Sequence, residues 1–317
     1  MEAPRRVFVA GGTGAIGRHL VPVLLRDGHE VVVLSRSRER AAPLEALGAE
    51  VAVADALDHI ALLRSVENAR PDAIVHQLTA IPEDARLRKL DRDFALTNRL
   101  RTDATDTLLE AARRVGARRV VAQSFCGWTY ARTGDAIKTE EDSLEPDPPS
   151  AFRETLAAIR HVEEAVREAR DLEGVALRYG WFYGPGTGLA EGGGMVDLVM
   201  RRRLPIVGDG GGVWSFIHID DAALATVAAL RGGAPGVYNI VDDEPAQVSV
   251  WLPVLAEAVE ARPPFRIPVW LARLAIGEGG VRMMTENRGA ANGKAKRELG
   301  WTPTVPSWRV GFREALE

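Results

Sequence analysis

A glycine-dense stretch near the start of the chain, residues 7–17 with the sequence VFVAGGTGAIG, constrains the fold more than any other feature. Apolar residues lead directly into the glycines, and apolar residues at helical spacing follow from residue 16 to residue 25. This order of strand, tight turn and helix is the context of the G-x-G-x-x-G fingerprint, in which backbone N–H groups at a helix N-terminus hold a pyrophosphate. We therefore expect a bound dinucleotide in contact with Gly11, Gly12, Thr13, Gly14, Ala15, Ile16 and Gly17.

Strand-like and helix-like segments alternate through the first half of the chain. Short apolar runs predict strands at 31–34, 50–54, 73–76, 119–123 and 175–179, and amphipathic segments predict helices at 38–47, 57–66, 94–115 and 151–169. Such alternation is typical of an α/β fold with a doubly wound, Rossmann-type parallel sheet. We expect a dinucleotide-binding domain at residues 1–180, with 215–242 returning to it. Residues 181–214 and 243–317 are then a smaller C-terminal substrate lobe.

Composition excludes several classes of partner. The chain has 317 residues, 46% of them hydrophobic, which supports a sizeable core, and its net charge of −4 provides no general attraction to nucleic acid or membrane. Its single cysteine, Cys126, rules out an internal disulfide and suits a reducing compartment. No apolar run approaches the roughly 20 residues of a membrane helix, and the first strand begins too early for a signal peptide. We expect a cytoplasmic protein whose partners are small molecules.

Four further segments carry recognisable motifs: VHQLTA at 75–80, RYGWFYGPG at 178–186, SFIHIDDAA at 215–223 and KAKRELGWTP at 294–303. Together with GGTGAIG they resemble the extended short-chain dehydrogenase/reductase family, which includes sugar-nucleotide epimerases and dehydratases. The resemblance implies that Asp55 contacts the adenine and that Asn98 is the family's helix asparagine. It implies further cofactor contacts from Ala56, Leu78, Thr79 and Tyr179.

The end of the second expected strand indicates which dinucleotide binds. An acid at this position would accept hydrogen bonds from the adenosine ribose and repel a 2′-phosphate, whereas this chain has Ser35, Arg36, Ser37 and Arg38. A guanidinium pairs with phosphate through a planar fork, and a serine hydroxyl can donate to it as well. We predict NADP(H) rather than NAD(H); the alternative is a solvated, basic start of a helix.

The family's catalytic groups are only partly present. Members transfer hydride with a Tyr-x-x-x-Lys pair, in which the lysine holds the nicotinamide ribose, and a nearby serine or threonine orients the carbonyl. Counting back from Trp128 places Ser124 at the serine position. One alignment of the next helix puts Phe152 and Leu156 at the tyrosine and lysine positions, and another puts Thr155 and Ile159 there. Neither supplies a phenol or an amine, and no lysine lies between Lys138 and Lys294.

Three functions follow from this departure. The first is an atypical NADP(H)-dependent reductase of a ketone or similar carbonyl, with Ser124 orienting the oxygen and the proton coming from water, the substrate or another side chain. The candidate replacement donors are Tyr130, Tyr179, Tyr183 and His218. The second is a sugar-nucleotide epimerase with a relocated acid, and the third is a non-catalytic dinucleotide-binding sensor.

The remaining signals each allow a structural and a functional interpretation. The loop at 125–150 is either disordered or a cover, and Cys126 is either a nucleophile or a buried thiol, which we favour. Asp220 and Asp221 beside His218 fit a helix start better than a metal site, so we predict no metal.

Two further features concern surfaces and the lobe. The run Arg201-Arg202-Arg203 is a solvated face or a contact for substrate phosphate. Five of the seven tryptophans lie in the expected lobe, where we predict that they form core: Trp214, Trp251, Trp270, Trp301 and Trp308. By resemblance, the helices at 94–115 and 151–169 would pair in a homodimer.

Overall fold

A seven-stranded parallel sheet organises the computed structural model, which describes residues 5–82 and 85–315. Its strands run in the order β12-β7-β5-β4-β1-β2-β3. Their bounds are β1 Arg6–Ala10, β2 Glu30–Ser35, β3 Glu50–Val53, β4 Ala73–His76, β5 Arg119–Phe125, β7 Glu173–Tyr179 and β12 Gly236–Ile240. The apolar runs form central strands because helices cover both faces, and β1 is fully buried from Val7 to Ala10. The predicted Rossmann-type α/β fold is confirmed.

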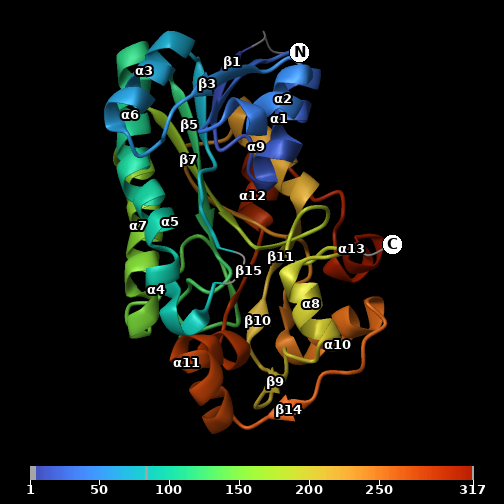
Figure 1. Ribbon diagram of the computed structural model, residues 1–317. Coiled ribbons are helices and arrows are strands. Elements are labelled where there is room, and N and C mark those ends of the chain that lie inside the picture. Colours follow the sequence, from blue (N-terminus) through green and yellow to red (C-terminus); the bar gives the residue numbers. More distant parts are fainter. Residues whose placement is uncertain (1–4, 83–84, 316–317) are drawn as a thin grey trace.

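Helices lie in two layers around this sheet (Figure 1). One layer holds α1 (Ala15–Arg26), α2 (Arg38–Ala46), α9 (Ile219–Arg231) and α12 (Gly293–Glu298), with α1 packed on α9. The other holds α3 (His59–Ala69), α4 (Leu90–Asp93), α5 (Ala95–Arg99), α6 (Thr105–Val115) and α7 (Arg153–Glu168). Strand order reverses between β1 and β4, which is where doubly wound sheets bind their ligands.

The helix expected at 94–115 is interrupted. Its middle, η2 (Leu100–Ala104), is a π-helical turn between α5 and α6, and the helix ends at Gly116 with φ +76°. Apolar spacing predicted the extent of this helix but not the π turn, because one widened turn changes the periodicity very little. Such turns are rare and frequently lie at functional sites.

The C-terminal lobe consists of short strands and helices around an aromatic core, in the lower part of Figure 1. Its strand pairs are β8 (Trp181–Tyr183) with β11 (Phe216–His218), β9 (Ile206–Val207) with β14 (Arg266–Ile267), β10 (Val213–Trp214) with β13 (Ala246–Gln247), and β6 (Ile137–Lys138) with β15 (Gly289–Ala290). Its helices are α8 (Gly194–Met200), α10 (Val248–Ala258), α11 (Val269–Thr285) and α13 (Trp308–Glu314). Two 3₁₀ turns, η1 (Leu87–Lys89) and η3 (Ser150–Phe152), border this lobe.

Four of the five tryptophans predicted as core are buried: Trp214, Trp251, Trp301 and Trp308. The prediction is wrong for Trp270, which is 65% exposed in the first turns of α11. Residues 126–149 form a covering loop: Tyr130 in it is buried, and β6 in it pairs with β15. No helix in the described part of the chain is long and apolar enough to span a membrane.

Candidate cofactor and active site

The glycine loop after β1 has the geometry that a dinucleotide requires. Gly11 adopts φ +98°, and a Cβ there would lie 2.7 Å from the backbone carbonyl of Gln77 at the end of β4. A Cβ at Gly17 would collide with the carbonyl oxygens of Gly11 and Gly12. Gly14 caps α1 with no side-chain hydrogen bond, which leaves the first N–H groups of the helix available to an anion. These residues fit a pyrophosphate.

The polar and basic residues after β2 differ in whether they are free to bind a ligand. The Ser35 hydroxyl donates to the Ser37 carbonyl and accepts from the Ser37 N–H, so it is used locally. Arg38 is paired with Glu45. Arg36 is an exposed cation with no ion pair among the described residues. Of the residues predicted to select the cofactor, Arg36 is therefore the best placed to meet a 2′-phosphate.

The expected adenine contact also has a defined local geometry. Asp55 follows β3 and accepts a hydrogen bond from the Leu57 N–H at 2.9 Å. Ala56 beside it is buried. The carboxylate therefore keeps acceptor capacity for a ligand.

The end of β4 carries a hydrogen-bonded histidine. His76 contacts the Thr105 hydroxyl through Nε2 at 3.0 Å, and the Leu78 N–H approaches its Nδ1 at 3.3 Å. Burial, with a smaller contribution from the nearby Arg101 cation, lowers the pKa of His76 to about 4. The ring is therefore neutral at physiological pH. Thr79, three residues after His76, is half-buried.

Gln77 and Tyr179 connect the central strands. The Gln77 side-chain amide donates to the Tyr179 hydroxyl at 3.1 Å, and that hydroxyl contacts Thr226 at 2.6 Å. Burial raises the pKa of Tyr179 to about 12. Tyr179 is fully buried beneath the site, so its phenol is poorly suited to donate a proton to substrate.

Ser124 does not lie where its predicted role requires. Its hydroxyl is buried and donates to Glu163 Oε1 at 2.6 Å, and Glu163 holds the Arg178 guanidinium through two bonds of 2.7 and 2.6 Å. The network continues from Arg178 to the Tyr130 hydroxyl at 2.9 Å and from there to Asn239 at 2.7 Å. Because its hydroxyl is bonded to Glu163 on α7, Ser124 points under this helix, where it belongs to a buried hydrogen-bond network. Its role in orienting a substrate stays a prediction.

The other candidate donors are also engaged. Burial raises the pKa values of Tyr130 and Tyr183 above their ordinary range. His218 caps α9 by accepting the Asp220 N–H. Cys126 contacts the carbonyl oxygens of residues 178 and 179, and burial raises its pKa to about 12, as expected of an inert thiol.

The positions where the Tyr-x-x-x-Lys pair would lie, at the start of α7 and just before it, carry apolar side chains and one threonine. Phe152, Leu156 and Ile159 are buried there. Thr155 donates its hydroxyl proton to Asp91 Oδ1 at 2.8 Å and accepts from the Asn98 amide at 3.2 Å. Neither alignment therefore places a free proton donor at this position.

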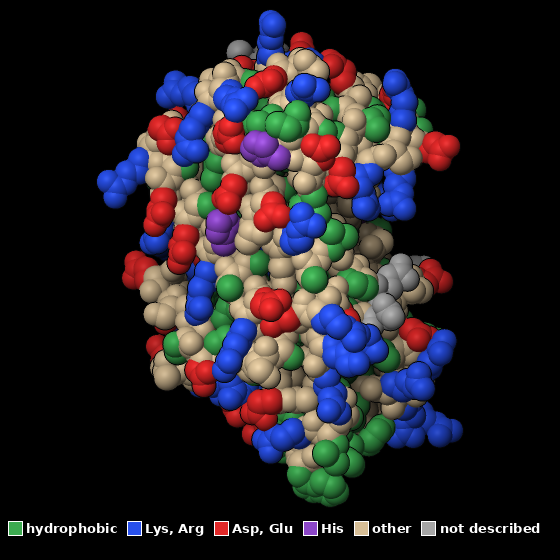
Figure 2. Space-filling view, turned by 60° about the vertical axis from the view of Figure 1, so that its left-hand side comes forward, with side chains coloured by type: hydrophobic (Ala, Val, Ile, Leu, Met, Phe, Trp, Pro, Cys, Tyr) green, Lys and Arg blue, Asp and Glu red, His purple; other side chains and the backbone are tan. Residues whose placement is uncertain are grey.

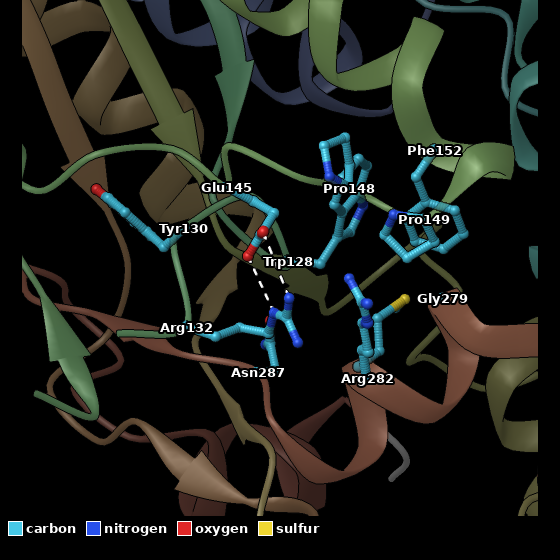
Figure 3. Close-up of a pocket in the computed structure, with 11 residues that line it drawn as sticks. Trp128, Tyr130, Arg132, Glu145, Pro148, Pro149, Phe152, Gly279, Arg282 and Asn287 are labelled. Carbon is cyan, nitrogen blue, oxygen red and sulfur yellow. Dashed lines mark hydrogen bonds and ion pairs between the residues drawn. The ribbon is translucent and has the colours of Figure 1, made fainter. Parts of the chain in front are cut away.

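A small cavity borders this region, between the loop 126–149 and α11 (Figure 3). Trp128 and Phe152 meet edge to face at 4.8 Å on one side of it, with Pro148 and Pro149. Arg132, paired with Glu145 at 3.0 Å, and Arg282 lie on the other side. Its volume of about 30 Å³ accommodates a water molecule but not a substrate, so a substrate could enter only if the loop shifted.

Two buried charged groups were missed from the sequence. The Glu163–Arg178 pair was detectable, because a charge within a buried apolar strand requires a partner. Arg101 lies on a helix that was expected to pair in a homodimer, yet it is buried within the chain.

The acidic pair at the start of α9 and the arginine run at 201–203 are the remaining sequence motifs. Asp220 pairs with His19 at 2.6 Å, and Asp221 accepts from the N–H groups of residues 304 and 305. The part of the chain that the structure describes holds no group of three metal-ligating side chains. Arg201, Arg202 and Arg203 are exposed, and Arg201 pairs with Asp197.

Comparison with known proteins adds independent findings. Residues 7–241 match the model of the NAD dependent epimerase/dehydratase family. The chain is 45% identical over 310 residues to a 3-diazoavenalumate denitrifying reductase from Streptomyces sp., covering 97% of this chain and 99% of that one. It is 28% identical over 325 residues to a 4-hydroxy-2-methyl-3-oxo-4-farnesyl-3,4-dihydroquinoline-1-oxide ketoreductase from Stigmatella aurantiaca, covering 95% and 92%. Its fold matches that of Thermus thermophilus UDP-glucose 4-epimerase in complex with NAD, with a TM-score of 0.74, 28% identity and coverage of 98% and 97%.

Proposed function

The chain belongs to the NAD-dependent epimerase/dehydratase family, and from this premise we propose that it is an NADP(H)-dependent reductase that replaces an aromatic diazo group by hydrogen. The observation that carries the proposal is the inner face of α7, where the family's acid is replaced by apolar side chains and by Thr155, whose proton is bonded to Asp91. A reductase of this kind needs a substrate whose reduction does not generate a strong base.

A diazo-bearing aromatic carbon is such a substrate. Reduced nicotinamide, when bound, supplies the hydride. The hydride's electron pair forms the new C–H bond, and the electron pair of the C–N bond leaves with N₂. A zwitterionic diazophenolate thereby becomes a phenolate and N₂, and no proton is transferred at the reacting carbon. Reduction of a ketone instead produces an alkoxide, for which a positioned acid contributes roughly 10²–10⁴ in rate.

The residues of this chain have three tasks in the proposed reaction. The glycine loop and the first turn of α1 hold the pyrophosphate, and Arg36 pairs with the 2′-phosphate. Trp128, half-buried at the cavity and supported by the buried Phe152, would offer an aromatic surface to a planar ring once the loop 126–149 shifted. The 45% identity to a reductase of a diazo compound supports this substrate class.

Carbonyl reduction is the second candidate, because a ketoreductase is among the relatives. The proton would then come from water or from the substrate itself. Epimerisation fits the site less well, since removal and return of a hydride at an alcohol carbon require an acid and a base in turn.

Turnover assays separate these functions. Purified protein with NADPH is incubated with 3-diazoavenalumate, with an arenediazonium salt and with a panel of aryl ketones, while NADPH oxidation and N₂ release are measured. We expect one N₂ released for each NADPH oxidised, with little ketone reduction. Ketone turnover without diazo turnover would favour the second candidate, and tight cofactor binding without any turnover would favour a sensor. Retained oxidised cofactor with interconversion of sugar nucleotides would favour an epimerase.

We also propose a cytoplasmic location and a homodimer through the helices at 94–115, which comprise α5, η2 and α6, and at 151–169, which comprise α7. The single reduced cysteine supports the location. Acidic and basic side chains are interspersed over this face (Figure 2), including His161 with Asp106 and Arg113 with Asp171, so the interface would be polar. Sedimentation measurements test the dimer.

A further inference from the structure

Arg101 is a buried cation without a partner. It is 4% exposed on the π-helical turn η2, and its Nε and Nη1 atoms make no hydrogen bond within the described chain. Asn98 Oδ1 and Gln77 Oε1 are likewise buried and unpaired. The other buried cations all have acceptors: Arg119 bonds backbone carbonyls and Glu173, Lys138 bonds Thr133 and Asp142, and Arg178 bonds Glu163.

A buried cation and buried amide oxygens without hydrogen-bond partners destabilise a fold unless a bound ligand supplies the partners. Burying a charge or a polar group without a partner is strongly unfavourable, so an unsatisfied buried group in a folded protein requires an explanation such as an absent ligand. Burial lowers the pKa of Arg101 to about 10, so the guanidinium remains charged at physiological pH. Asn98 and Arg101 are three residues apart along the helix, which gives them neighbouring positions on one side of it.

The place of this group in the fold indicates the ligand. Arg101 lies near His76 at the carboxyl end of β4, because the Thr105 hydroxyl contacts His76 Nε2 at 3.0 Å and donates to the Arg101 carbonyl oxygen at 2.7 Å. Gln77 follows β4 and touches Gly11 of the glycine loop across the reversal of strand order. A dinucleotide held by this loop lies across the reversal, with its adenosine toward β2. Its other half must therefore extend over β4 and β5, toward Arg101.

We propose that Arg101, together with Asn98, binds the nicotinamide half of the cofactor through the hydroxyls of its ribose. A ribose hydroxyl both donates and accepts, so it can satisfy a guanidinium N–H and an amide oxygen at once. Arg101 thereby holds the nicotinamide ribose, which is the role of the lysine in other family members, but it does so from a different helix. The inference rests on the proposed function only in taking the ligand to be a nicotinamide dinucleotide.

Binding measurements on substituted proteins test this assignment. Arg101→Met and Arg101→Lys are titrated calorimetrically with NADPH and with 2′,5′-ADP, which lacks the nicotinamide ribose. We expect Arg101→Met to weaken NADPH binding about 10- to 100-fold, as for the loss of charged hydrogen bonds, and to leave 2′,5′-ADP binding within about twofold. Arg101→Lys should lose less. Arg99→Met, an exposed change on the same helix, is the matched control.

Thermal melting of the cofactor-free proteins distinguishes a ligand-binding role from a structural one. Removing an uncompensated buried charge should maintain or raise the Tm of Arg101→Met without cofactor, while the increase in Tm caused by NADPH should shrink. A lowered Tm with unchanged NADPH affinity would overturn the proposal, as would an equal loss of NADPH and 2′,5′-ADP binding. Unchanged NADPH affinity with a raised KM for an anionic substrate would assign Arg101 to the substrate instead. These binding measurements hold whichever substrate the protein reduces.

Discussion

The glycine loop and the inner face of α7 lie at the same ligand-binding end of the sheet but differ in how much of the family's pattern they keep. The loop keeps Gly11 at φ +98° and keeps Gly17 where a Cβ would collide with backbone carbonyl oxygens, and a Cβ at Gly12 would meet the Val33 side chain. At the α7 positions where either alignment expects the family's catalytic pair, the structure has buried apolar side chains and the hydrogen-bonded Thr155. The contrast teaches that cofactor binding and proton transfer are separable parts of this fold, and that a reaction without proton transfer could dispense with the second.

The largest expected effect tests whether the network under α7 is structural. Glu163→Leu would leave Arg178 buried without its carboxylate, and we expect a loss of about 3–5 kcal/mol in the free energy of unfolding. Urea denaturation measures it, with exposed Glu164→Leu as the control. A loss as small as that of the control would show that the network does not hold α7 against the sheet.

The next prediction tests the geometry of the glycine loop. In Gly17→Ala the new methyl would collide with the carbonyl oxygens of Gly11 and Gly12, displacing α1 from the turn at a cost of about 1–3 kcal/mol. We expect NADPH affinity to fall at least about tenfold. Gly188→Ala, where a Cβ meets open space, is the control for titration and melting. Wild-type affinity in Gly17→Ala would contradict the assigned loop geometry.

The third prediction concerns the preference for NADPH over NADH at the cofactor-binding loop. Arg36→Ala should weaken NADPH binding about tenfold and leave NADH binding nearly unchanged, because the lost contact is to the 2′-phosphate. Arg38→Ala should have a smaller effect, since Arg38 is already paired with Glu45. Equal affinities for both cofactors across all three proteins would remove the case for NADP(H).

The smallest effect concerns Ser124. Ser124→Ala removes one hydrogen bond to Glu163, which keeps its two bonds to Arg178, so we expect a loss of about 1 kcal/mol in stability. Turnover should change less than about threefold, because the hydroxyl does not face substrate. A decrease in kcat of roughly 10² or more would restore Ser124 as a catalytic group.

The parts of the molecule that depend on local pattern were predictable from the sequence. The strand at 73–76 was predicted with its observed bounds, since a short apolar run between turn residues has few other conformations. The glycine loop was predictable because the spacing of its glycines between an apolar strand and an apolar helix is itself the local pattern.

The misplaced residues depend on contacts between distant segments. Counting from Trp128 gave Ser124 its position along the strand, but its engagement depends on Glu163, 39 residues away on α7. The burial of Arg101 depends on how the π turn η2 packs, and residue spacing carries no signal for this. Trp270 is exposed although tryptophans of the lobe core are buried, because the beginning of α11 projects beyond that core.

The central claim, hydride transfer without a protein acid, is tested most directly by isotope labelling. The protein reduces 3-diazoavenalumate with NADPH deuterated at nicotinamide C4 in ordinary water, and with unlabelled NADPH in D₂O. The account predicts one deuterium from the cofactor at the carbon that lost nitrogen, and none from solvent at that carbon. Deuterium from solvent at that carbon, or product carrying no cofactor deuterium, would contradict it.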